Sequence, residues 1–499
     1  MDASILTGFA GVFADPICLV LILVATGIGI IFGAIPGLTA TTAIAMFLPV
    51  TYSLDIIPSI SLLVALYIGG ISGGLLSAIL LNIPGTPSSI ATCFDGRPLA
   101  LKGQAGKALG VGIVFSFLGT VISIAALMII AQPLADFTIK FGPWEYFSVT
   151  FFSLSLIAGL SGNNIIKGLM AAVLGMMFST VGTAPIDGVM RFTLGTNALS
   201  GGFQTMTVLV GLYAIGEMLE TAGGIQAGND VKVNSDIRLK GVGFSFKEFI
   251  SQIGNFIRSA LIGIGIGILP GIGGGTSNLL AYSAAKNSSK HPERYGTGII
   301  DGVVASETAN NATIGGAMIP LLTLGIPGDA VTAMLLGGFI LQGVQPGPLI
   351  FLQHANVVYA VYAAMLLASV IMLIWMFGGL RWFVHLLKVP KNYLLPAIMV
   401  LCLIGAFALN NRTFDVWALL FFGMVGYGLS KVKVPLPPLI LGFVLGGTFE
   451  TNLRRGLQLS GGSFMGVFSS KIAAVFMAVG ILSVIWQVWK LMKNTKRAA

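Results

Sequence analysis

Charged side chains are scarce in this sequence. They make up 9% of its 499 residues, whereas 55% are hydrophobic, and so few charges cannot cover the surface of a water-soluble globule. This scarcity excludes a soluble enzyme or binding domain and predicts a polytopic membrane protein. Apolar stretches of about the length of a spanning helix recur along the chain, for example at 17–33, 60–81, 108–131, 357–379 and 470–487. We expect about ten to twelve spanning helices in an all-α fold.

Cysteine and histidine are also rare, with three residues of each. Cys18, Cys93 and Cys402 stand alone, which excludes a disulfide framework or zinc site and favours packing roles. No His-Glu-x-x-His or Gly-x-Ser-x-Gly motif occurs, and the glycine-rich stretch 271–277 has no lysine to make it a phosphate-binding loop. The sequence therefore predicts no enzyme activity and no cofactor.

Basic residues give the chain a formal charge of +9. No nucleic-acid partner is expected, because these residues lie in short loops and in the C-terminal tail. Retention of basic loops in the cytoplasm explains the distribution better, in a chain whose surroundings are the lipid bilayer. The same rule places the C-terminal tail, the 381–391 loop and a polar segment near the middle of the chain in the cytoplasm.

Four Pro-Gly signatures interrupt the apolar stretches, in the same order in each half. The first half has Gly33-Ala-Ile-Pro-Gly37 and Asn82-Ile-Pro-Gly-Thr86, and the second has Gly267-Ile-Leu-Pro-Gly271 and Gly325-Ile-Pro-Gly-Asp329. A helix broken inside a bilayer frees peptide groups that hydrocarbon cannot satisfy, so such breaks line protein or a water-filled cavity. Paired breaks in corresponding halves are typical of a transport site, although a single break can be an ordinary kink.

The polar stretch 221–246 separates the two halves. We interpret 1–220 as a first transmembrane repeat, 221–246 as a cytoplasmic linker and 247–499 as a second repeat. The relative orientation of the repeats follows from the loops that flank the second signature of each half. The basic loop comes after that signature in the first half (Arg97, Lys102, Lys107) and before it in the second half (Lys286, Lys290, Arg294). This reversal predicts an inverted-topology repeat with broken or re-entrant helices, with a parallel repeat as the alternative.

Each Pro-Gly pair is predicted to precede a new helix whose first N–H groups face a cavity, because proline suits the first turn of a helix. Such helix ends, with neighbouring hydroxyl and amide groups, attract carboxylates without a fixed cation. No lysine or arginine precedes Arg97, and none lies between Arg294 and Arg381. The predicted substrate-binding residues follow the four breaks: Gly37, Thr39, Thr41, Asn82, Gly85, Thr86, Ser88, Gly271, Thr276, Ser277, Asn278 and Gly328.

A polar cluster lies inside the apolar stretch 299–324. Glu307, Asn310 and Asn311 are spaced to share one side of a helix. An intramembrane carboxylate is expensive and usually functional, so we predict cation coupling here, by Na⁺ or by H⁺. An interhelical hydrogen-bond clamp is the alternative. Asp329 is assigned to a cation site or to a helix-end position.

The motifs taken together resemble those of the tripartite tricarboxylate transporter family, large membrane subunit of the TctA type. The resemblance covers essentially the whole chain. It depends on the joint order of the motifs that begin at Gly33, Tyr67, Asn82, Asp95, Leu269, Glu307, Leu324 and Gly343.

The resemblance implies a bacterial inner-membrane permease that works with a small four-helix membrane subunit and a periplasmic solute-binding protein. It implies import of a di- or tricarboxylate such as citrate, driven by a Na⁺ or H⁺ gradient. The charge of Asp329 departs from the family's usual small or polar residue and leaves the exact substrate open. A passive channel or exporter is the first alternative function, and a membrane-embedded enzyme, which no motif supports, is the second.

Overall fold

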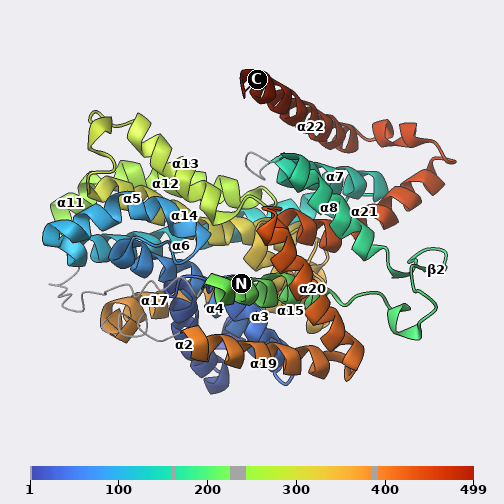
Figure 1. Cartoon of the computed structure of the whole chain (residues 1–499), viewed down its shortest axis with the longest axis horizontal. Helices are drawn as coiled ribbons and strands as arrows, with labels where there is room; N and C mark the ends of the chain where they lie inside the picture. Colours follow the sequence, from blue (N-terminus) through green and yellow to red (C-terminus); the bar gives the residue numbers. More distant parts are fainter. Residues whose placement is uncertain (1–2, 160–164, 225–242, 381, 384–390, 499) are drawn as a thin grey trace.

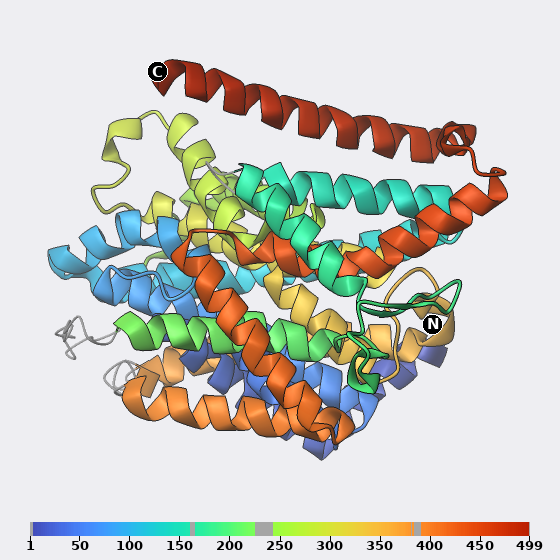
Figure 2. The same ribbon diagram turned by 45° about the vertical axis from the view of Figure 1, so that its right-hand side comes forward.

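Helices make up nearly all of the chain that the computed structural model describes, which comprises residues 3–159, 165–224, 243–380, 382–383 and 391–498. Figures 1 and 2 show these helices packed side by side, with the C-terminal helix α22 (Lys471–Ala498) along one edge. The sequence predicts an all-α fold, but the described residues also contain a two-stranded antiparallel hairpin, formed by β1 (Gly182–Thr183) and β2 (Met190–Arg191).

The first half begins and ends its helices at the two predicted breaks. Pro36-Gly37 separate the second helix from the third, and Pro84-Gly85 follow the fourth helix. The elements are α1 (Ala3–Phe13), α2 (Pro16–Ala34), α3 (Ala40–Thr51), α4 (Ile56–Leu81), η1 (Pro87–Ser89), α5 (Ile90–Leu99), η2 (Ala100–Gln104) and α6 (Ala105–Thr138).

The second half also begins and ends helices at its own two breaks. Pro270-Gly271 separate α12 from α13, and Pro327-Gly328 separate α14 from α15. The elements are α11 (Phe246–Ser251), α12 (Ile253–Ile268), α13 (Gly273–Asn287), η6 (Pro292–Arg294), α14 (Ile300–Leu324), α15 (Ala330–Leu341), α16 (Ile350–Gln353) and α17 (Ala355–Gly378).

Further helices follow each of these blocks. After the first block come α7 (Pro143–Gly159), α8 (Ile165–Ser179), η3 (Asn197–Leu199), α9 (Thr205–Val210), η4 (Gly211–Ile215) and α10 (Gly216–Gly224). After the second come α19 (Lys391–Asn410), α20 (Thr413–Lys431), α21 (Leu436–Leu459), η7 (Phe464–Ser469) and α22. The two sets pack on each other, α7 and α8 against α21 and α22, and η4 and α10 against α20.

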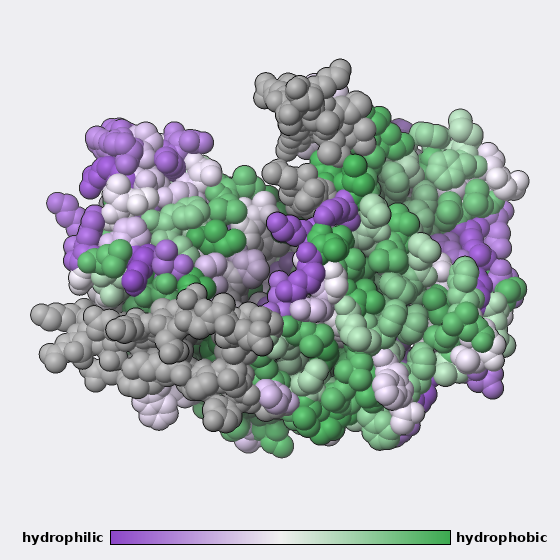
Figure 3. All heavy atoms as spheres, in the orientation of Figure 1, coloured by the Kyte–Doolittle hydropathy of each residue, from purple (hydrophilic) through white to green (hydrophobic). Residues whose placement is uncertain are grey.

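The described helices identify a membrane protein. Five are long and apolar enough to cross a bilayer: Pro16–Ala34, Ile56–Leu81, the bent run Pro87–Thr138, Ala355–Gly378 and Thr413–Lys431. Seven shorter apolar helices accompany them: Ser4–Phe13, Ala40–Thr51, Ile165–Ser179, Ile253–Ile268, Ala330–Leu341, Ile398–Ala408 and Lys471–Gln487. Figure 3 shows hydrophobic surface over much of the molecule, with hydrophilic side chains gathered towards its left end and right edge.

Helices α4 and α14 form the centre of the protein. The apolar stretch of α4 is entirely buried, and α14 is buried from Gly302 to Thr323. Each is the long helix that precedes the second break of its half. The next long helix packs across the halves, because α6 of the first half lies on α14 and α17 of the second half lies on α4. The two halves are therefore interlocked.

Buried polar contacts also join the halves. The carboxylate of Asp95, on α5, is fully buried and accepts hydrogen bonds from the second half. Its Oδ1 accepts from the N–H of Gly298 (2.8 Å) and of Ile299 (3.1 Å), and its Oδ2 accepts from the hydroxyl of Tyr282 (2.9 Å). The loop between α13 and α14 is fixed against α5 in this way.

The described end of the predicted linker is attached to the first half. Most of the 221–246 stretch, residues 225–242, lies outside the described residues. At its end Ser245 caps α11, and Glu248 of that helix pairs with Lys107 at the start of α6. The hydrogen bond from Lys107, together with that from the backbone N–H of Ser245, lowers the pKa of Glu248 to about 2. Glu248 therefore stays ionised at any physiological pH.

Close packing of α12 on α14 generates a stability prediction. A Cβ on Gly267 would lie 2.7 Å from the carbonyl oxygen of Thr313 and 2.8 Å from the backbone nitrogen of Ala317, whereas a Cβ on Gly265 would meet no atom within 4 Å. We expect Gly267→Val to lower the free energy of unfolding by ~1–3 kcal/mol or more, because the helices must separate. Gly265→Val, the matched control with the same change of helix propensity, should be much milder. Thermal unfolding in detergent measures both, and equal losses would contradict the packing argument.

Candidate functional site

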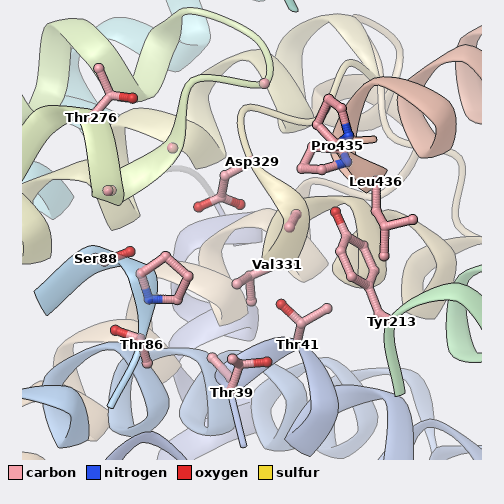
Figure 4. A pocket seen from close by; sticks show the side chains of 18 of the residues that line it. Thr39, Thr41, Thr86, Ser88, Tyr213, Thr276, Asp329, Val331, Pro435 and Leu436 are labelled. Atoms are coloured by element: carbon pink, nitrogen blue, oxygen red, sulfur yellow. The ribbon is translucent and has the colours of Figure 1, made fainter. Parts of the chain in front are cut away.

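The segments that follow all four Pro-Gly breaks meet at one cavity of about 710 Å³ (Figure 4). Its wall includes Thr39 to Thr41 before and within α3, Thr86 to Ser88 at η1, Gly271 to Thr276 at α13 and Asp329 to Val331 at α15. The other side of the wall comes from η4, α10 and the connection between α20 and α21. Breaks that lie more than two hundred residues apart in the sequence are thus brought to a single place.

The two kinds of break need glycine for different reasons. Gly37 and Gly271 have φ angles of 86° and 77°, in the left-handed region that favours glycine. Gly85 and Gly328 instead pack against main chain, and a Cβ on Gly328 would lie 2.5 Å from the carbonyl oxygen of Gly267. Gly271 also donates its N–H to the carbonyl of Gly328 at 2.7 Å. The two breaks of the second half therefore touch each other.

Carboxylates occupy the starts of two of the helices. At α3, the Glu217 carboxylate accepts hydrogen bonds from the hydroxyls of Thr39 (3.1 Å) and Thr42 (2.7 Å). At α15, Asp329 is itself the N-cap, and its Oδ1 accepts from the N–H of Thr332 at 2.7 Å. Its Oδ2 accepts from the hydroxyl of Tyr67 at 2.7 Å. Asp329 is thus at a helix-end position and on the cavity wall at once.

The start of α13 has no such cap. Its N-cap residue is Ile272, which forms no side-chain capping bond, and Gly273, Gly274 and Gly275 make up the first turn. The first N–H groups of a helix have no partner within the helix. Those of α13 lie on the cavity wall beside Thr276 and Ser88.

Half of the predicted substrate-binding residues line the cavity, namely Thr39, Thr41, Thr86, Ser88, Gly271 and Thr276. The other six are not part of the described lining. Ser277 bonds Thr313 (2.7 Å), and the Asn278 side chain accepts from the N–H of Ala91 (2.8 Å) and donates to the carbonyl of Ser306 (3.3 Å). Asn82 ends α4 with a φ of 58°. Gly37, Gly85 and Gly328 shape the breaks and do not face the cavity.

Glu307 and Asn311 form a separate polar cluster outside the cavity lining. The fully buried carboxylate of Glu307 accepts from the hydroxyls of Thr92 on α5 (2.5 Å) and Ser116 on α6 (3.0 Å). Asn311 donates to the same carboxylate at 3.4 Å and accepts from Ser72 on α4 at 2.7 Å. All three hydroxyls come from the first half. The cluster therefore joins the halves as well as holding a buried carboxylate.

Asn310 lies between this cluster and the cavity. It adjoins Glu307, yet neither its Nδ2 nor its Oδ1 has a hydrogen-bond partner of acceptable geometry, although the residue is only 1% exposed. Its Oδ1 is 2.9 Å from the position that a Cβ on Gly274 would take. The amide therefore lies directly behind the cavity wall.

The wall also contains polar residues that were not predicted from the sequence, namely Tyr213, Glu217, Glu220, Ser430 and Lys433. Tyr213, Glu217 and Glu220 follow the spacing of one helical face, a pattern that the polar linker beginning at 221 obscured. Lys433 follows α20 with a φ of 57° and is the one basic residue of the described lining. Its place in a short basic loop indicated only a cytoplasmic position.

The described lining has the composition of a ligand-binding site. It includes no histidine or cysteine, and no group of three metal-ligating side chains occurs among the described residues. It combines open helix N–H groups and hydroxyls with three carboxylates and one lysine. The arrangement suits reversible binding of a small polar solute.

A family model and a related protein each match most of the chain. The model of the "Tripartite tricarboxylate transporter TctA family" matches residues 19–441. An uncharacterized 52.8 kDa protein of Agrobacterium vitis, from the TAR-I ttuC' 3' region, is 36% identical over 470 residues, which cover 94% of this chain and 93% of that protein. A second uncharacterized protein of the same organism, from the TAR-II ttuC' 3' region, is 39% identical over 220 residues, which cover 44% of this chain and 91% of that protein. No solved structure matches the chain.

The neighbours Thr276 and Asn278 provide a test of which side chains face the cavity. Asn278→Ala removes the acceptor for the Ala91 N–H and should lower the free energy of unfolding by ~1–3 kcal/mol. Thr276→Val, on the cavity wall, should change it by no more than ~0.5 kcal/mol. Thermal unfolding of the two purified variants measures the difference. A stable Asn278→Ala variant would remove the structural role given to that side chain.

Proposed function

Because the chain belongs to the tripartite tricarboxylate transporter TctA family, we propose that it is the large permease subunit of a binding-protein-dependent secondary transporter. Family membership makes it the membrane component of a transporter and not an enzyme. The proposed activity is import of a di- or tricarboxylate of the citrate class, coupled to a cation gradient. The observation that carries this proposal is the meeting of all four Pro-Gly breaks at one cavity.

The cavity has the size and chemistry for such a solute. A volume of about 710 Å³ falls within the range of small-molecule sites. Helix starts direct N–H groups at its interior, and Thr39, Thr41, Thr86, Ser88 and Thr276 supply hydroxyls. Carboxylate oxygens are acceptors for both kinds of donor. Gly37, Asn82, Gly85, Ser277, Asn278 and Gly328 contribute indirectly, by holding the breaks and the wall in place.

We assign cation coupling to Glu307, Asn310, Asn311 and Asp329. A carboxylate with hydroxyl and amide oxygens suits Na⁺, and a buried carboxylate also suits a proton relay. Hydroxyls of the first half, on Thr92, Ser116 and Ser72, donate to Glu307 and Asn311, which also bond each other. Occupancy at Glu307 is therefore coupled to the contact between the halves, as alternating access requires.

Inverted repeats, 1–220 and 247–499 with the linker 221–246, are the architecture we propose. The equal element order and the reciprocal packing of α6 on α14 and α17 on α4 support it. Contacts between loops support it too. The loop 51–59 of the first half and the segment 342–356 of the second half both lack lysine and arginine, and they touch: the Gln342 side chain donates to the carbonyl of Thr51 (2.6 Å) and to the hydroxyl of Ser59 (3.0 Å). The two basic loops meet at Asp95. Ten to twelve crossings then include several of the shorter apolar helices.

The remaining partners follow from the family. We propose a small four-helix membrane subunit and a periplasmic solute-binding protein as the other two components. The system would lie in a bacterial inner membrane, with the C-terminus of this chain in the cytoplasm, on the side of the basic loops.

Reconstituted transport tests the function and the coupling residue together. Proteoliposomes that hold this chain and its small subunit should accumulate labelled citrate only with the binding protein outside and an inward Na⁺ or H⁺ gradient. Glu307→Gln should abolish accumulation, because the neutral amide cannot exchange a cation. Glu293→Gln, a change in an exposed loop, is the matched control and should transport normally. Uptake without a gradient or binding protein would favour a channel, and unchanged ion dependence in Glu307→Gln would remove that residue from coupling.

Cysteine accessibility tests the inverted topology. In a chain whose native cysteines are replaced, Asp55→Cys and Gln345→Cys should react with a membrane-impermeant maleimide from the periplasm, and Lys102→Cys and Ser288→Cys from the cytoplasm. Labelling of intact cells and of inside-out vesicles distinguishes the two faces. If Asp55 and Ser288 shared a face, the repeats would be parallel.

A further inference from the structure

The four helix starts at the cavity differ in charge. The start of α3 faces the Glu217 carboxylate, and the start of α15 carries the Asp329 carboxylate. A carboxylate at the positive end of a helix dipole satisfies that end and repels another anion. Two of the four starts are therefore poor places for a negatively charged ligand.

The start of α13 is open by comparison. Its N-cap, Ile272, offers no side-chain acceptor, and its three glycines leave the first-turn N–H groups unscreened. Thr276 of the same helix and Ser88 of the other half line the cavity here, on the side away from Tyr213 and Leu436 in Figure 4.

One deeply buried hydroxyl on the wall lacks a partner. It belongs to Thr86, a residue that is 3% exposed, whereas the Asn310 amide lies behind the wall and adjoins the Glu307 carboxylate. Ser88 Oγ lies 2.8 Å and Asn310 Oδ1 2.9 Å from the position of a Cβ on Gly274, so both adjoin the first turn of α13. Buried polar groups are rarely left unsatisfied, so the Thr86 hydroxyl is available to donate to a ligand at this place.

We propose that the anionic group of the substrate binds at the start of α13, against Ser88 and Thr86 and in front of Asn310, and not at α3 or α15. The inference rests on the proposed function and names the carboxylate subsite within that cavity. Glycine at 274 lets Ser88 and Asn310 approach the first turn of α13 closely, because a Cβ there would lie within 3 Å of both side chains.

Asp329 is a negative neighbour of this subsite. Its Cβ is 3.3 Å from the position that a Cβ on Gly273 would take. Its two oxygens bond Thr332 and Tyr67, on α15 and α4. The substrate anion therefore occupies the Ser88 side of the α13 start, beyond the contact with Asp329.

Charge-selective labelling tests the subsite without knowledge of the substrate. Thr276→Cys and Ala330→Cys are made in the full-length chain, with Cys18, Cys93 and Cys402 replaced by alanine. Each reacts with an anionic (2-sulfonatoethyl) and a cationic (2-trimethylammonioethyl) methanethiosulfonate. The anionic-to-cationic rate ratio should be about tenfold higher at Thr276→Cys, given the potentials that such sites produce. Ser88→Cys gives a second reading and should resemble Thr276→Cys. Equal ratios, or a higher ratio at Ala330→Cys, would overturn the proposal.

Adding Asp329→Asn to the Ala330→Cys variant tests whether the Asp329 carboxylate causes the lower anionic-to-cationic rate ratio at position 330. Asparagine also caps helices well, so the helix start is kept while its charge is removed. The ratio at Ala330→Cys should then rise towards that of Thr276→Cys. An unchanged ratio would show that the carboxylate does not disfavour anions there, against the proposal.

A charge-matched pair links the subsite to the substrate. Thr276→Asp should weaken citrate binding to the chain with its small subunit at least tenfold in calorimetry, because a fixed carboxylate takes the open helix start. Thr276→Asn loses the same hydroxyl but adds no charge, so it should bind citrate at least tenfold more tightly than Thr276→Asp. Wild-type affinity in Thr276→Asp would refute the subsite and leave carboxylate transport intact. A wild-type chain that bound no carboxylate would instead refute the proposed function.

Discussion

Where a helix breaks inside a membrane, its free N–H and C=O groups need hydrogen-bond partners, and this constraint governs the structure. In the second half the two breaks satisfy part of this need between themselves, through the N–H of Gly271 and the carbonyl of Gly328. The helix starts beyond the breaks then face a common space, and two of them are met by the carboxylates of Glu217 and Asp329. The cavity exists because the four breaks meet, and its charge pattern follows from which starts are capped.

Buried carboxylates tie the two halves together. Glu307 depends on Thr92 and Ser116, and Asp329 on Tyr67, in each case across the halves. Removing one partner of a buried charge is costly, so these contacts fix the relation between the halves in the described state. A transport cycle that moves one half against the other must exchange such partners. This arrangement supports our proposal that the carboxylates at the interface link ion occupancy to the conformation of the protein.

The breaks, the helices that follow them and the buried Glu307 cluster could be predicted from the sequence, because proline, glycine and intramembrane charge have strong local effects. The directions in which neighbouring side chains point could not be predicted. Thr276 lines the cavity, whereas Ser277 and Asn278 turn into the protein, since successive residues of a helix differ by about 100°. Glu217 and Lys433 reach the wall through tertiary packing of α10 and of the segment after α20, which no local pattern specifies. The two-residue strands of the hairpin were missed for the same reason.

The exchange of α6 and α17 between the halves has a consequence for biosynthesis. When the ribosome has finished the first half, the face of α4 that receives α17 is still without its partner. That partner ends at Gly378, nearly three hundred residues after α4 itself ends at Leu81. Nascent halves therefore cannot mature one after the other. A chain truncated before α17 would leave that face of α4 without its partner helix.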